Sequence, residues 1–202
     1  ADVLIEDAPP GRMPALGLDW SDLQTTNPRL IHVSITAFGR SGPGTGDAFT
    51  DLTLLAGGGP AWSCGYDDHS LPPVRGGGNQ GYQTACHYAV MALLVALLER
   101  DVSGLGQFVE VNGNAAANVT TEASSYSWLV AGQTVQRQTG RHAGVNPSIN
   151  TQIRCADGRY ATTGLPPRRG DDFRRMLGWL DQLGFRAEFD QWPFLELGME
   201  RD

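Results

Sequence analysis

The stretch from Gly81 to Val111 constrains the fold more than any other part of the chain. It begins with polar residues, continues into an apolar run from Ala85 to Leu98, and ends as a short strand. Ala, Leu and Met dominate the apolar run, and these residues favour helix over strand. Because apolar residues occur on every side of such a helix, we expect it to be buried nearly all round. A membrane span is the competing interpretation, but a span needs about 20 apolar residues, and this run is shorter and includes His87.

The segments before this helix alternate between strand and helix patterns. Asp2–Glu6 and Arg29–Thr36 are short aliphatic runs, and a helix pattern with early acidic residues begins at Asp19 between them. Two strands joined through a helix form a parallel pair. With the strand Phe108–Val111 after the long helix, the pattern predicts an α/β fold with a parallel sheet.

The second half of the chain predicts a further unit. A helix is expected from about Asn114, followed by a polar linker or crossover over Gln133–Asn150. Thr151–Cys155 and Arg159–Thr163 flank an Ala-Asp-Gly turn typical of a hairpin, and Asp171–Leu183 has an amphipathic helical pattern. We therefore expect one domain over residues 1–145 and the beginning of a small α+β domain over residues 146–202.

Composition excludes several classes of function. The net charge of -7 argues against a nucleic-acid surface, and all 15 basic residues are Arg, so no lysine is present to form a Schiff base. The three cysteines have no spacing typical of a metal site or a disulfide framework. We therefore expect no metal and a reducing, cytoplasmic location.

A glycine-rich segment, Phe38–Gly59, is the first candidate for a ligand site. Glycine lets backbone amides approach a ligand, and long loops in α/β proteins often carry the site. The alternative is a flexible connection built from turn residues. Gly76–Gly78 is a second such stretch, but no Gly-Lys-Ser/Thr follows it, so it is not a nucleotide-binding P-loop. For His32, within the second strand, we expect a structural role.

The block ALLERDVSGLGQFVEV, which closes the long helix and enters the strand after it, resembles the class III CoA-transferase family. This is the CaiB/BaiF group, which includes formyl-CoA transferase, carnitine CoA-transferases and α-methylacyl-CoA racemase. Similar segments extend along essentially the whole chain, so we expect it to match roughly the middle half of a full-length member. The resemblance implies a Rossmann-like large domain, incomplete here, with a small domain. It also implies an intertwined homodimer and no membrane partner.

The resemblance further implies the ligands and the chemistry. Acyl-CoA would be the substrate and a carboxylic acid the acceptor, with no covalently bound cofactor. In the transferases, an Asp carboxylate attacks the thioester, forms a mixed anhydride and becomes an aspartyl-CoA thioester. The residues that the resemblance places at coenzyme A are Asp7, Ala8, Phe49, Thr50, Asp51 and Leu52.

This chain departs from the family at the catalytic position. The family Asp follows the glycine that starts the long helix, whereas Tyr82 follows Gly81 here. A phenol with an ordinary pKa of about 10 is neutral at pH 7 and cannot form the anhydride. The racemase branch pairs the same Asp with a His where this chain has Thr50, and an Asn-Phe of the family is replaced by Asp7-Ala8.

Four interpretations are open. The first is a CoA-transferase-like enzyme with an altered active site, in which the role of Tyr82 is open. The second is a catalytically inactive module for acyl-CoA binding or dimerisation, and the third is a purely structural fragment. The fourth is a racemase- or isomerase-type activity.

Overall fold

The computed structural model describes residues 1–162, 167–188 and 193–200. The chain forms two compact units, Ala1–Asn150 and Thr151–Asp202, which are described separately. The boundary between two domains that we predicted at residues 145 and 146 stays a prediction.

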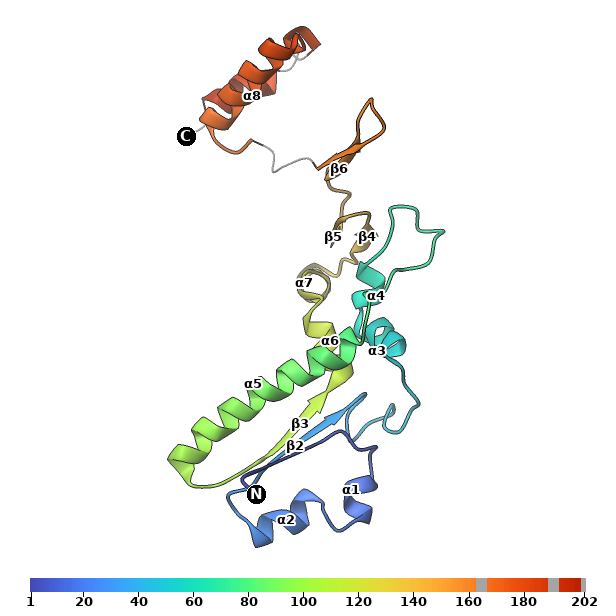
Figure 1. Cartoon of the computed structure of the whole chain (residues 1–202), viewed down its shortest axis with the longest axis vertical. Coiled ribbons are helices and arrows are strands. Elements are labelled where there is room, and N and C mark those ends of the chain that lie inside the picture. The colour runs from blue at the N-terminus through green and yellow to red at the C-terminus, as the bar shows by residue number, and fades with distance from the viewer. Residues whose placement is uncertain (163–166, 189–192, 201–202) are drawn as a thin grey trace. The chain divides into compact units, whose positions relative to one another are not determined.

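The first unit is built on a parallel sheet of three strands in the order β1-β2-β3 (Figure 1). The strands are β1 (Val3–Glu6), β2 (Ile31–Thr36) and β3 (Phe108–Asn112). The short helices α1 (Arg12–Ala15) and α2 (Trp20–Thr26) lie between β1 and β2 in the chain. The central strand β2 is buried at every position, as its aliphatic composition requires. The predicted α/β fold with parallel strands is confirmed.

The long helix α5 (Gln80–Ser103) packs against one face of this sheet. Small side chains on the helix meet aliphatic side chains of the central strand. The buried residues of this core are Ile31, Val33, Ile35, Ala85, Ala89, Ala96, Val111 and Ala116. Alanines allow the helix to approach the sheet closely, so the register of the helix follows the spacing of its small residues.

The expectation that α5 is buried nearly all round is wrong. Its side away from the sheet carries apolar side chains that are exposed in this chain: Val90, Met91, Leu94, Val95, Leu98 and Val102. The sheet offers α5 a single surface, so the other sides of a helix with apolar residues all round stay in contact with solvent. Within the described residues, α5 is the one helix with the length and hydropathy of a membrane span, features that core helices share.

The segment after β2 contains more helix than the sequence predicted. The glycine-rich stretch ends at α3 (Asp51–Gly58), which is followed by α4 (Pro60–Ser63). The hydroxyl of Thr50 accepts the amide of Thr53, and the Thr53 hydroxyl accepts the amide of Thr50, which together form a capping box. This reciprocal cap and the following leucines are the local signal for the start of α3.

The segment after β3 also differs in part from the expectation. The predicted helical region is divided into α6 (Gly113–Val119) and α7 (Glu122–Ala131). The expected linker over Gln133–Asn150 instead contains a short antiparallel pair, β4 (Gln136–Gln138) and β5 (Arg141–Gly144), which turns at a left-handed Gly140. Strands of three and four residues are too short to show an alternating pattern.

The second unit contains the predicted hairpin and amphipathic helix. Its elements are β6 (Gln152–Arg154), β7 (Tyr160–Thr162), α8 (Gly170–Leu183), the 3-10 turn η1 (Arg186–Glu188) and α9 (Pro193–Met199). β6 and β7 pair antiparallel, and α8 packs against α9. Thr163, which was expected to end the second strand, lies outside the described residues.

Candidate active site

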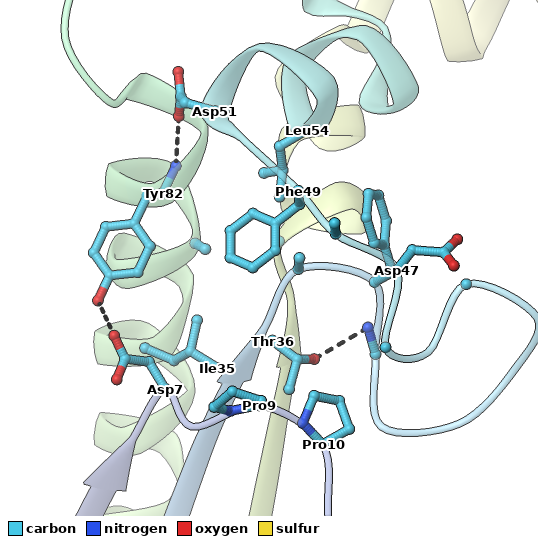
Figure 2. A pocket seen from close by; sticks show the side chains of 18 of the residues that line it. Asp7, Pro9, Pro10, Ile35, Thr36, Asp47, Phe49, Asp51, Leu54 and Tyr82 are labelled. Carbon is cyan, nitrogen blue, oxygen red and sulfur yellow. Dashed lines mark hydrogen bonds between the residues drawn. The ribbon is translucent and has the colours of Figure 1, made fainter.

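A pocket of about 680 Å³ opens at the carboxyl end of the parallel sheet (Figure 2). Residues that follow β1 and β2 form part of its wall, and the first turn of α5 closes it. Its lining includes Asp7, Pro9, Pro10, Thr36, Phe38, Asp47, Phe49, Asp51, Leu54, Asn79 and Tyr82. This is the edge at which open α/β sheets bind ligands, because the loops that diverge there leave a crevice.

The glycine-rich loop that lines one wall is held to the sheet at its first residues. The amide of Gly39 donates to Oγ1 of the buried Thr36 at 3.0 Å, and the amide of Arg40 donates to Oε1 of Glu110 at 2.5 Å. Gly39 has a φ of 91°, and a side chain there would also crowd Asn112. These contacts fix the direction in which the loop leaves β2.

The Arg40 side chain extends these contacts to the opposite face of the sheet from α5. Its guanidinium donates to Oδ1 of Asp19 at 2.7 Å and lies 3.6 Å from Oε1 of Glu6. It also lies over the ring of Phe108, 5.0 Å from the centroid. Arg40 therefore connects the loop that lines the pocket with residues on the far side of β2.

Tyr82, the residue at the predicted catalytic position, lies in the wall of the pocket. Its hydroxyl donates to Oδ2 of Asp7 at 2.9 Å (Figure 2). This hydrogen bond to a carboxylate, with lesser effects of burial and of the Asp7 charge, raises the pKa of Tyr82 to about 12. The phenol therefore stays neutral and acts as a hydrogen-bond donor at physiological pH.

Asp51 joins the start of α3 to the start of α5. It is the first residue of α3, and its Oδ1 accepts the backbone amide of Tyr82 at 3.1 Å. Its Oδ2 lies 3.3 Å from Nη1 of Arg75. The carboxylate side chain is only 7% exposed, and a Cβ on Gly81 would come within 2.9 Å of its Oδ1. Asp51 thus supplies α5 with a cap that the side chain of Asn79 does not provide.

Five of the seven predicted site residues line the pocket: Asp7, Ala8, Phe49, Asp51 and Tyr82. The other two, Thr50 and Leu52, lie beside them in the chain but outside the lining. The Thr50 hydroxyl caps α3, and the Leu52 side chain is 51% exposed. The coenzyme A-binding role of six of them, and the catalytic role of Tyr82, stay predictions. His32 lies elsewhere, buried against Phe108 with ring centroids 5.1 Å apart.

Several lining residues were not selected from the sequence. Pro9 and Pro10 follow β1, and Thr36 ends β2. A signal for them exists, since the residues just beyond the carboxyl ends of parallel strands meet at one edge. Within the described residues, no cluster of three or more His, Cys, Asp or Glu side chains is arranged to hold a metal ion. The chemistry that the pocket offers rests on carboxylates, a phenol and backbone groups.

Comparison with protein families gives a match over most of the chain. The model of CoA-transferase family III matches residues 1–189. A subunit of succinyl-CoA:(R)-benzylsuccinate CoA-transferase from Thauera aromatica, BbsE, is 33% identical over 196 residues, which are 97% of this chain and 45% of that protein. Formyl-CoA:oxalate CoA-transferase from Streptomyces avermitilis is 33% identical over 111 residues, covering 55% of this chain and 26% of the relative.

Comparison with solved structures agrees. A CAIB/BAIF family protein from Brucella suis superposes with a TM-score of 0.75 at 25% identity, over 96% of this chain and 49% of that one. This chain thus spans less than half the length of these relatives.

Proposed function

The chain belongs to CoA-transferase family III, and from this membership we propose that the protein transfers coenzyme A from an acyl-CoA to a carboxylic acid at the pocket beside Tyr82. The single observation that carries the proposal is the position of this pocket. It lies at the carboxyl end of the parallel sheet, and residues that the sequence assigned to acyl-CoA binding form its wall.

The lining suits a thioester with a polar head. Phe49, Ala8 and Leu54 offer apolar surface, and Asn79 offers an amide for a carbonyl oxygen. Arg75, paired with Asp51, brings a guanidinium to the same region, and a guanidinium can hold a phosphate through two hydrogen bonds. Acyl-CoA as donor, a carboxylic acid as acceptor, a homodimer and a cytoplasmic location are parts of this proposal.

Tyr82 favours a second candidate, a subunit that binds acyl-CoA or a partner chain without turnover. A neutral phenol whose pKa is raised to about 12 is a poor nucleophile. The relative from Thauera aromatica is itself named as a subunit. Racemisation has less support, since it needs a pair of bases, and the Thr50 hydroxyl is engaged in the cap of α3.

An exchange assay distinguishes the first two candidates. The purified protein is incubated with succinyl-CoA and either benzylsuccinate or oxalate, and the acyl-CoA products are separated by mass. A new acyl-CoA ester supports transfer. Retention of CoA on the protein without exchange supports the binding subunit, and the absence of both contradicts the proposal.

A further inference from the structure

The pocket contains a carboxylate that no motif assigned to catalysis. Asp7 is the first residue after β1, so it lies at the edge of the sheet where the pocket opens. Its Oδ2 accepts the hydroxyl of Tyr82 at 2.9 Å. In the described part of the chain, its second oxygen, Oδ1, accepts no hydrogen bond. One oxygen is therefore held and the other is left for a ligand in the pocket.

The two other carboxylates in the lining are placed differently. Both oxygens of Asp51 are occupied, one by the amide of Tyr82 and one by Arg75, and the side chain is nearly buried. Asp47 lies in the glycine-rich loop, and its side chain accepts no hydrogen bond from the described residues. Asp7 alone combines a fixed position with an unoccupied oxygen.

We propose that Asp7 is the carboxylate nucleophile of this pocket and that Tyr82 is the residue that positions it. This inference rests on the proposed CoA transfer. A hydrogen bond from a neutral donor fixes the carboxylate in one orientation, which raises the fraction of time that Oδ1 faces a bound thioester.

The steps balance without an added oxidant or metal. Oδ1 of Asp7 attacks the thioester carbonyl; a C–O bond forms, the C–S bond breaks, and CoA leaves as the thiolate. The thiolate then attacks the Asp7 carbonyl carbon, which forms an aspartyl-CoA thioester and releases the donor acid as a carboxylate. The acceptor carboxylate and CoA repeat the two steps in reverse, which gives the new acyl-CoA and regenerates Asp7.

Trapping the covalent intermediate tests the assignment. The protein is incubated with succinyl-CoA alone, digested, and analysed by peptide mass spectrometry for CoA attached to a carboxyl group. We expect the adduct on Asp7 in the wild type and its absence in Asp7→Asn, with exchange lowered at least about 1,000-fold. Asp101→Asn is the matched control, an exposed carboxylate in the last turn of α5 outside the pocket lining, and it should keep exchange within about twofold of the wild type.

Tyr82→Phe tests the positioning role separately. Loss of a hydrogen bond to a charged group should lower kcat about 10- to 100-fold while KM stays nearly constant and the adduct still forms on Asp7. A rise in KM of about 10- to 100-fold with kcat unchanged would overturn the positioning role. Melting temperatures of the variants within about 3 °C of the wild type show that folding is unchanged, and Asp7→Glu should recover part of the adduct if Asp7→Asn melts lower.

The outcomes separate the two proposals. Exchange with an adduct on another residue, or exchange retained in Asp7→Asn, overturns the assignment of Asp7 and leaves CoA transfer in place. A wild type with neither exchange nor adduct overturns both.

Discussion

Replacing Asp51 by Ala removes the side chain of α3 that caps the N-terminal end of α5. The carboxylate accepts the amide of Tyr82 in the first turn of α5 and stands at the first position of α3. Loss of a capping acceptor costs about 1 kcal/mol. Loss of a negative charge near the positive ends of two helices costs about 0.5 kcal/mol more at each end. We therefore expect Asp51→Ala to lower the free energy of unfolding by about 2 kcal/mol, or the melting temperature by about 4–8 °C.

The partner of Asp51 contributes less. Arg75 is 39% exposed, so its ion pair is screened by water, and Arg75→Ala should cost no more than about 1 kcal/mol. Asp51→Asn keeps an acceptor oxygen and loses the charge, so it should fall between the two. Urea unfolding followed by circular dichroism measures all three variants.

A matched control lies at the other end of α5. Asp101 is exposed in the last turn, where a negative charge opposes the helix dipole, so Asp101→Ala should be neutral or slightly stabilising. The reasoning is refuted if Asp51→Ala unfolds within 0.5 kcal/mol (about the error of the method) of the wild type. It is also refuted if Arg75→Ala costs as much, because the ion pair and not the cap would then carry the effect.

Two further predictions concern the sheet. His32 is fully buried, and desolvation lowers the pKa of its imidazole. The unfolded chain therefore binds a proton near pH 6.5, whereas the folded chain does not. The free energy of unfolding should fall below pH 6.5 by up to about 1.4 kcal/mol per pH unit. Urea unfolding between pH 7.5 and 5.5 measures this slope, and His32→Gln should reduce it. An equal slope in the wild type and in His32→Gln would show that His32 does not cause the pH dependence. Gly106→Ala places a Cβ 1.8 Å from the carbonyl oxygen of Leu30 and should cost about 3 kcal/mol or more. Gly104→Ala, with a φ of 78° and an ordinary contact of 3.8 Å to Nη1 of Arg29, should cost about 1 kcal/mol. Thermal melting compares the two glycine variants, and equal losses would show that the close approach is relieved by a small shift.

The sheet and the main helices were predictable because their signals are local. The aliphatic runs of β1 and β2, with a helix between them, specify a parallel pair by themselves. The composition of the long helix specified α5, yet it did not show how many sides of that helix meet other elements. That depends on how much of the sheet surface is present to cover it.

The central contacts of the site were not predictable from a single sequence. Asp7 and Tyr82 are 75 residues apart, and Asp51 and Tyr82 are 31 apart. Each residue alone has a plausible local role, such as a turn after a strand or a helix start. Their hydrogen bonds depend on the folded arrangement of β1, α3 and α5, which no periodicity reports.

Arg40 has a consequence for how the shape of the pocket could change. Its backbone belongs to the loop that lines the pocket, while its side chain is bound on the far side of β2 to Asp19. A substitution at Asp19, which does not line the pocket, should therefore alter the resting position of that loop. Directed evolution limited to the cavity wall would overlook this indirect control of the pocket's shape.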